Sequence, residues 1–172
     1  MLGNIKGLAV TFATFFRKPV TTQYPKNRKP VEMRFMGFPV LTWDEKIGEP
    51  FCTGCMVCVR YCPTQCMTAV MKDNPLREEG KSPRRKIVDS FEINLGRCIL
   101  CGICVDVCNF DAIEMSHEHE LSKHARNGNR TDLEKLLEMG KAYQVEVGWK
   151  PEKETQVPKK DAQQEEIEEA EK

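Results

Sequence analysis

The sequence predicts an α+β fold made of two similar halves, and three observations lead to this expectation. Two stretches of cysteines share the spacing C-x₂-C-x₂-C-x₃-C. The second stretch begins at Cys98, 46 residues after the first begins at Cys52. The same shift places Met67 on Ile113, so an apolar position follows each stretch. We therefore expect a pseudo-twofold domain in which each half supplies one cysteine-bearing loop and one short helix.

The cysteine content restricts the class of protein. Nine cysteines in 172 residues indicate either a disulfide-stabilised chain or a metalloprotein. An odd number of cysteines cannot all form disulfides within one chain, so a fully disulfide-bonded protein is disfavoured. The first residues also lack the charged start, apolar centre and cleavage site of a signal peptide. We therefore expect a reducing compartment, in which the cysteines are thiolates bound to metal.

The charges are segregated along the chain, although the formal net charge is zero. Residues 1–36 hold seven Lys or Arg against one Glu, a net charge of +6, and residues 151–172 hold eight acids against four Lys, a net charge of −4. Charged ends of this kind indicate attachment surfaces or solvated surfaces around a near-neutral centre. We expect no nucleic-acid binding, because no nucleic-acid fold signature accompanies the basic end.

Residues 1–18 are predicted to form an amphipathic helix. Ile5, Leu8 and Phe12 follow one another at helical spacing and share a face. The uncharged part of this segment is only ten residues long, which is too short to cross a bilayer core of ~30 Å. Two interpretations stay open on these residues alone. The helix lies on a membrane surface or a membrane subunit, or it packs on its own domain.

Residues 19–44 are predicted to form an extended basic arm, because its prolines remove backbone donors and fix φ. Within the arm, residues 34–37 and 40–43 are expected to be short strands separated by a Gly–Phe–Pro turn. Residues 45–116 hold both cysteine stretches and are expected to form the core domain.

The chain after the core is expected to contain two further segments. Residues 117–150 form a docking segment with a short helix, which begins at Thr131 as N-cap and ends before Gly140 as C-cap. Residues 151–172 form an acidic tail that is nearly free of large apolar residues, and we expect this tail to be disordered.

The cysteine spacing suits two 4Fe–4S clusters. Three cysteines, each three residues after the last, direct their thiolates at one cluster, and Gly54 and Gly102 let the backbone curl closely. The fourth cysteine, four residues on, starts a helix and ligates the other cluster. Cluster 1 is therefore predicted to be held by Cys52, Cys55, Cys58 and Cys108. Cluster 2 is predicted to be held by Cys98, Cys101, Cys104 and Cys62.

Zinc is the main alternative for these cysteines. Zinc sites usually combine two separated C-x₂-C pairs, so two uninterrupted runs favour iron–sulfur clusters. The ninth cysteine, Cys66, aligns with Ala112 in the repeat. We therefore predict that Cys66 is a small buried apolar side chain.

Two further features lie near the cluster motifs. Pro63 follows the first stretch, whereas Asn109 stands in the equivalent place after the second. We predict that Asn109 shifts the reduction potential of the cluster that Cys108 ligates, relative to an Asn109→Pro variant. His117 and His119 suggest a metal site, but the cysteines already account for the cofactors, so a charged surface turn is our interpretation.

Several stretches resemble one known family. They are Lys-Pro-Val-Thr-Thr-Gln-Tyr-Pro at 18–25, Arg-Phe-Met-Gly at 34–37, Gly-Arg-Cys-Ile-Leu-Cys-Gly-Ile-Cys-Val at 96–105 and His-Glu-Leu-Ser at 119–122. With the two cysteine stretches, they resemble the 8Fe ferredoxin-like subunit of respiratory complex I, the NADH–quinone oxidoreductase subunit I family. The resemblance covers roughly residues 3–140. The acidic tail lies outside it, and Asn109 departs from it.

The resemblance implies a fixed electron relay. Electrons from NADH and flavin would cross both clusters and pass to the terminal cluster beside the quinone site. The chain would be one subunit of a multi-subunit oxidoreductase, with no catalytic residue of its own. Its partners would be other peripheral-arm and membrane subunits, and its N-terminal helix would contact the membrane surface. No glycine-rich dinucleotide motif is present, so we expect no direct NADH or flavin binding.

The expected location is the cytoplasmic face of a prokaryotic inner membrane, where the chain would be peripheral. Two alternatives remain. One is a stand-alone dicluster ferredoxin, and the other is the equivalent subunit of a ferredoxin-fed or hydrogenase-type complex. About 44 residues precede the core and about 56 follow it, which favours a chain that binds partners over a free carrier.

Overall fold

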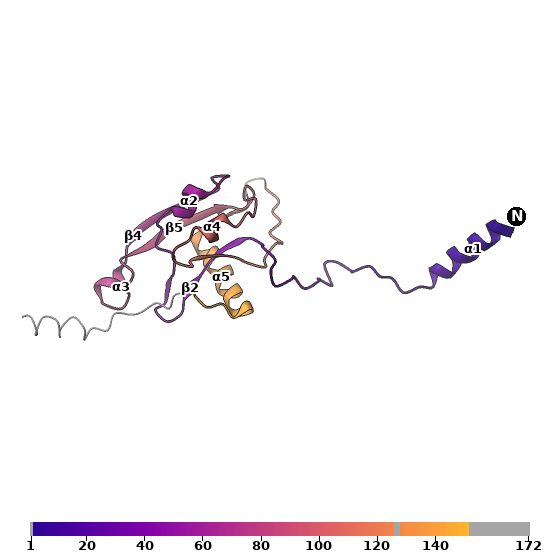
Figure 1. Ribbon diagram of the computed structural model, residues 1–172, viewed down its shortest axis with the longest axis horizontal. Helices are drawn as coiled ribbons and strands as arrows, with labels where there is room; N and C mark the ends of the chain where they lie inside the picture. Colours follow the sequence, from indigo (N-terminus) through magenta and orange to yellow (C-terminus); the bar gives the residue numbers. More distant parts are fainter. Residues whose placement is uncertain (1, 126–127, 152–172) are drawn as a thin grey trace, which may run out of the picture. The chain divides into compact units, whose positions relative to one another are not determined.

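The computed structural model describes residues 2–125 and 128–151, and it divides into two units, Met1–Glu32 and Met33–Lys172. The first unit holds helix α1 (Leu2–Phe15), labelled in Figure 1, and residues 18–32 form neither helix nor strand. The acidic tail predicted for 151–172 lies outside the described residues, apart from Pro151.

The apolar side chains of α1 are exposed. Ile5, Leu8 and Phe12 are 65%, 72% and 66% exposed, and Phe12 and Phe16 pack edge to face with ring centroids 5.3 Å apart. Among the described residues, no helix combines the length and the apolar composition needed to cross a membrane.

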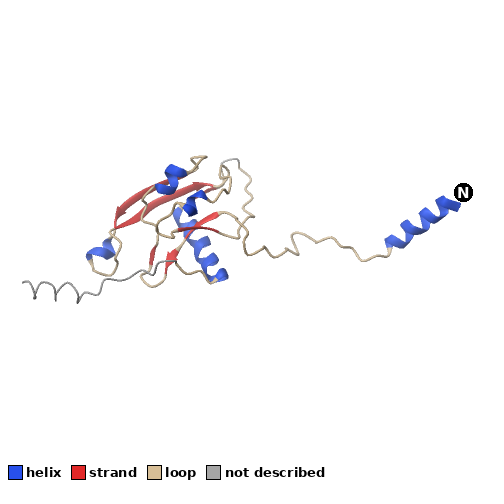
Figure 2. Ribbon diagram, in the orientation of Figure 1, coloured by secondary structure: helices blue, strands red, loops and turns tan. Residues whose placement is uncertain are grey.

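The second unit is built from antiparallel strand pairs (Figure 2). Strand β1 (Pro39–Leu41) pairs with β6 (Ile113–Met115), and β4 (Met67–Asp73) pairs with β5 (Lys86–Asn94). Strand β7 (Arg130–Thr131) adds to the free edge of β5, and β2 (Trp43–Asp44) forms a small hairpin with β3 (Glu49–Pro50). Helix α3 (Pro75–Glu78) lies in the connection between β4 and β5.

The elements repeat along the chain. Helix α2 (Val57–Tyr61) and helix α4 (Ile103–Asp106) begin 46 residues apart, and so do strands β4 and β6. Each half therefore runs strand, cysteine loop, short helix, strand. Both main strand pairs join one strand of the first half to one strand of the second, since β1 pairs with β6 and β4 with β5.

The core begins earlier in the chain than the sequence predicts. Residues 34–37 form no strand, and β1 starts at Pro39, where the sequence predicts a turn. Proline is tolerated at the first residue of a strand. Just before it, the Gly37 N–H donates to the Ser116 carbonyl at 2.7 Å. Residues 39–44, assigned to the arm, therefore belong to the strands of the core.

Helix α5 (Leu133–Val147) differs from the predicted helix at both ends. Its N-cap is Asp132, whose carboxylate accepts from the Lys135 N–H at 3.1 Å, and not Thr131. It ends at Gly148, which has φ +64°. Gly140 lies inside the helix and is buried. A Cβ at this position would collide with the Leu41 carbonyl, so this glycine allows α5 to pack closely on β1 rather than ending the helix.

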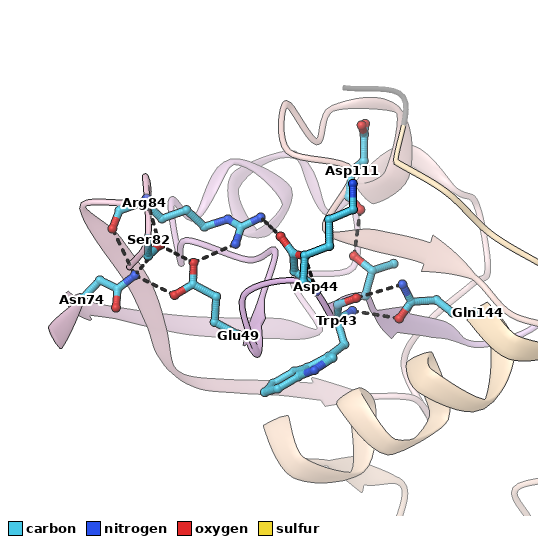
Figure 3. A network of polar contacts seen from close by, with 10 residues as sticks. Trp43, Asp44, Glu49, Asn74, Ser82, Arg84, Asp111 and Gln144 are labelled. Carbon is cyan, nitrogen blue, oxygen red and sulfur yellow. Dashed lines mark hydrogen bonds and ion pairs between the residues drawn. The ribbon is translucent and has the colours of Figure 1, made fainter. Parts of the chain in front are cut away.

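Apolar side chains from both halves and from α5 form one core. Leu41, Ile93, Ile113 and Leu136 are each less than 2% exposed. The amide of Gln144, on α5, also pairs with both backbone groups of Trp43, at 2.9 and 3.0 Å (Figure 3). The segment after the cysteines therefore closes the core, in addition to any docking role.

Candidate iron–sulfur site

The cysteines of the two stretches line two cavities. The first, cavity 1, is lined by Cys52, Cys55, Cys58 and Cys108. The second, cavity 2, is lined by Cys62, Cys98, Cys101 and Cys104. Each cavity thus collects three cysteines from one stretch and the fourth cysteine from the other. This grouping has the same members as the two predicted ligand sets, and the crossed ligation itself stays a prediction.

Left-handed backbone residues shape the cysteine loops. Gly54 (φ +72°) corresponds to Leu100 (φ +55°), and Met56 (φ +61°) corresponds to Gly102 (φ +77°), because both pairs are 46 residues apart. Each loop therefore turns at two such residues but has glycine at only one of them. The two glycines hold different places in the repeat. A Cβ on Gly54 would also approach the backbone of Met71 to 3.0 Å, which links this glycine to close packing on β4.

The cavity walls are mostly apolar. Apolar residues of the cysteine loops line both cavities: Met56 and Val57 line cavity 1, and Ile99, Leu100 and Ile103 line cavity 2. Phe91 and Phe110 complete the first wall, and Met67 and Met115 complete the second. Such walls exclude water and lower the local dielectric constant, both of which affect the potential of a bound cluster.

Burial sets the acidity of most thiols in the cluster-free chain. It raises the pKa of Cys52 and of Cys104 to about 12, and that of Cys58 to about 11, because desolvation disfavours the thiolate. Cys62 differs. Burial opposes its ionisation, but hydrogen bonds from Thr64 and Cys66 lower its pKa to about 7. Because a cluster binds thiolates, its assembly in these cavities releases protons.

The donor sets fit iron–sulfur clusters better than single ions. Within residues 2–125 and 128–151, no group of three or more His, Cys, Asp or Glu side chains is arranged to hold one metal ion. A zinc ion draws its ligands to within ~2.3 Å of one centre, whereas each cysteine of a four-iron cluster binds a different iron. Four soft thiolates around an apolar cavity are the ligands that such a cluster uses.

Cys66 is buried next to cavity 2 but outside its lining. Its side chain is 6% exposed, which agrees with the expected buried position, and its equivalent Ala112 is 2% exposed. Cys66 lines neither cavity. Its Sγ lies 3.6 Å from the Cys62 Sγ, however, so it contacts a predicted ligand. The repeat alignment alone gave no sign of this contact.

The remaining residues singled out from the sequence lie near the surface. Asn109 is exposed, and its effect on the potential stays a prediction. The two ring nitrogens of His117 lie 3.1 Å from the Glu146 carboxylate and 3.2 Å from the Met33 carbonyl. His119 lies 3.1 Å from the His117 carbonyl. Both histidines thus have hydrogen-bond partners within the protein.

Sequence reasoning missed a buried polar network beside the first cysteine loop (Figure 3). The Arg84 guanidinium lies 2.8 Å from Asp44 and 2.7 Å from Glu49, whose side chains are almost fully buried. The same guanidinium lies 4.7 Å from the ring centre of Phe51, the residue before Cys52. The network therefore ties the β4–β5 connection to the segment that enters the loop. The buried carboxylates come from a short hairpin, and the sequence around them gives no signal of their burial.

Comparison with known proteins places the chain in a family. Residues 51–112 match the family described as "4Fe-4S dicluster domain". NADH-quinone oxidoreductase subunit I 2 of Symbiobacterium thermophilum is 36% identical over 140 residues, covering 81% of this chain and 56% of that protein. The protein of the same name from Geobacter metallireducens is 35% identical over 135 residues, covering 78% of this chain and 95% of that protein.

Two further proteins match the chain. NADH-quinone oxidoreductase subunit I 2 of Streptomyces coelicolor is 39% identical over 124 residues, covering 70% of this chain and 60% of that protein. The chain thus spans less than two thirds of two of these relatives and nearly all of the third. A chain in the structure of a membrane-bound sulfane sulfur reductase, an archaeal respiratory membrane complex, is 25% identical with a TM-score of 0.42, covering 93% of this chain and 66% of that one. With its dicluster domain and these relatives, the chain belongs to the NADH-quinone oxidoreductase subunit I family.

Proposed function

We propose that this chain is an electron-relay subunit of a membrane-associated NADH:quinone oxidoreductase, passing electrons through two 4Fe–4S clusters toward a terminal cluster and quinone. The observation that carries the proposal is the pair of cavities, each lined by four cysteines, in a member of this family. The enzymatic reaction belongs to the assembly, and the chain itself only transfers electrons.

The ligand assignment is part of this proposal. Cys52, Cys55, Cys58 and Cys108 hold cluster 1, and Cys98, Cys101, Cys104 and Cys62 hold cluster 2. Bound clusters supply one-electron oxidation and reduction at these sites. The thiolates fix each site, and the apolar walls exclude water from it. Helices α2 and α4 contact each other, and each is followed closely by a cysteine of the other cavity, which keeps the two sites adjacent.

The two halves are proposed to be related by a pseudo-twofold axis. Helices α2 and α4 begin 46 residues apart, which supports this relation. The left-handed residues of the two loops are also 46 residues apart. One further pair, Gln65 (φ +50°) and Asp111 (φ +49°), follows the fourth cysteine of each stretch. The shared backbone at these places indicates that both loops present their thiolates in the same way.

The flanking segments are proposed to bind partners. The exposed apolar side chains of α1 suit an interfacial helix on a membrane or a membrane subunit, and the basic residues up to position 34 suit an anionic lipid surface. Residues 117–150 would dock the core on a neighbouring subunit. The chain would be peripheral, on the cytoplasmic side of the inner membrane.

The proposal is tested in membranes of a cell that makes this chain natively. A Cys58→Ser variant is expected to abolish NADH-driven quinone reduction. The variant should still oxidise NADH when an artificial acceptor takes the electrons from a cofactor upstream of this subunit. Unchanged quinone reduction would contradict the relay role. Recovery of the native chain only from the soluble fraction, with no co-purifying partner, would favour a stand-alone ferredoxin.

The electron donor is tested with the purified assembly. We expect NADH to reduce both clusters, observed by electron paramagnetic resonance (EPR). Reduction by ferredoxin but not by NADH would instead identify the ferredoxin-fed relative.

A further inference from the structure

The fourth cysteines of the two stretches have equivalent backbone surroundings. The Ala112 N–H donates to the Cys108 Sγ at 3.4 Å. The left-handed residues Gln65 (φ +50°) and Asp111 (φ +49°) stand at equivalent places after the two cysteines. Both crossing cysteines, Cys62 and Cys108, are thus followed by the same backbone turn.

The side chains around these two cysteines differ. The Thr64 Oγ1 lies 3.5 Å and the Cys66 Sγ lies 3.6 Å from the Cys62 Sγ. The equivalent residues in the second half are Phe110 and Ala112, whose side chains carry no polar hydrogen. Two side-chain donors therefore serve cavity 2 without counterparts at cavity 1.

The chemistry fixes the direction of these hydrogen bonds. A cysteine bound to iron is a thiolate and carries no hydrogen, so Thr64 and Cys66 must donate to Cys62 rather than accept from it. Cluster reduction adds one electron, which the proposed donor chain supplies, and moves no proton between these groups. Donated hydrogen bonds stabilise the added negative charge on the ligand sulfur, and low-dielectric surroundings strengthen them.

We propose that Thr64 and Cys66 raise the reduction potential of cluster 2 by donating hydrogen bonds to its crossing ligand Cys62. The inference rests on the proposed function and its ligand sets. Both residues are positioning residues rather than ligands. Cys66 lines neither cavity, although it touches Cys62. The pair therefore contributes to a difference in potential between the two sites.

The repeat supplies a matched series of variants. Cys66→Ala installs the residue that already stands at the equivalent place, and Thr64→Val removes the hydroxyl at nearly constant shape. Cys66→Ser keeps a donor. In the full-length chain purified with its clusters, both midpoint potentials are measured by EPR during redox titration. We expect the midpoint potential of one cluster to fall in Cys66→Ala and in Thr64→Val. The same midpoint should stay near its original value in Cys66→Ser. The midpoint of the other cluster should stay unchanged in all three variants.

The mirror variant, Ala112→Cys, adds a donor beside Cys108. We expect it to raise the midpoint that the other variants leave unchanged, which assigns the two signals to the two clusters. If this variant fails to fold, Thr64→Val and Cys66→Ala still decide the matter.

The other outcomes separate this inference from the proposed function. Two intact clusters with unmoved midpoints in both Cys66→Ala and Thr64→Val would overturn the inference and leave the relay role standing. Equal falls of both midpoints would show that the effect is not local, and would also overturn it. Loss of one cluster in Cys66→Ala would identify Cys66 as a ligand, so that both the inference and the proposed ligand set would be wrong.

Discussion

Arg84 is the residue on which the buried charges beside the first loop depend. It is the common partner of Asp44 and Glu49, and its side chain is 10% exposed. Asn74 and the Ser82 hydroxyl also donate to the Glu49 carboxylate, so the acceptors in this network are well satisfied (Figure 3). Buried charges are tolerated when they are paired and hydrogen-bonded, as they are here.

Replacing Arg84 by methionine is expected to destabilise the core strongly. The change leaves two buried carboxylates without their cation, and such a loss costs about 3–5 kcal/mol. Lys72→Met is the matched control, because it breaks an ion pair with Asp89 whose side chains are about half exposed, which is worth about 0–1 kcal/mol. Denaturant unfolding followed by circular dichroism measures both. Equal losses of stability in the two variants would contradict this account of the network.

His117 makes stability depend on pH. The hydrogen bond to Glu146 raises the pKa of His117 above its ordinary value of 6.5. Because the folded state holds the proton more tightly, this contact contributes its full stability below about pH 6.5. The contribution is lost as the pH rises through the raised pKa of the folded state.

A Glu146→Gln variant tests this linkage. We expect the melting temperature to differ more between the natural chain and the variant near pH 6 than near pH 8.5. When His117 is also replaced by Gln, the excess effect of Glu146→Gln on the melting temperature near pH 6 should become smaller. A difference that is the same at both pH values would contradict the proposed contact.

Single residues differ in how well the sequence predicts them. The grouping of the eight cysteines around two cavities is predictable, because their regular spacing brings three of them to one side of a loop. The left-handed Met56 and Leu100 are not, because other conformations are more common for such side chains. Arg84 is not predictable either, since its partners lie 40 and 35 residues away in the sequence.

At the scale of elements, α5 shows how a local rule gives way to packing. Gly140 follows a helical stretch and looks like a C-cap, yet the helix runs on to Val147. The glycine is required by the Leu41 carbonyl on β1, about a hundred positions earlier in the chain. Capping rules use only neighbours in sequence, so they cannot detect a constraint imposed by a distant strand.

Gly140→Ala is therefore expected to destabilise the core by about 1–3 kcal/mol, because the added methyl group forces α5 away from β1. In an unconstrained helix the same change is favourable by about 1 kcal/mol. Gly7→Ala in α1 is the control, since nothing lies within 4 Å of a Cβ there. We expect a lower melting temperature for the first variant and greater helicity of an α1 peptide for the second. A Gly140→Ala chain as stable as the original would contradict the close packing.

At the scale of the whole molecule, the sequence predicts the order of the cysteine loops and short helices better than the boundaries of the core. The repeat is visible because the cysteine spacing recurs within a short stretch. The start of the core is not visible, because β1 becomes a strand by pairing with β6, whose residues lie more than seventy positions later. The predicted arm therefore extended too far, into residues 39–44.

The N-terminal unit gives a prediction about membrane association. Replacing Leu8 and Phe12 together by glutamate should weaken co-sedimentation with vesicles that contain anionic lipid, because the apolar face of α1 no longer enters the interface. Thr11→Glu and Thr14→Glu together add the same charge at polar positions of the helix, and this control should retain more binding. Cluster content should be unchanged in both variants. Equal binding by both would contradict the membrane role of α1.

The central claim is that each cluster takes three cysteines from one stretch and the fourth from the other. Two double variants test it most directly, each compared with the unsubstituted chain by EPR of the reduced clusters. Cys62→Ser with Cys101→Ser places both changes on cluster 2, so one of the two signals should remain unaltered. Cys62→Ser with Cys55→Ser places one change on each cluster, so both signals should change. The reverse result, with one signal intact only in the second double variant, would contradict crossed ligation.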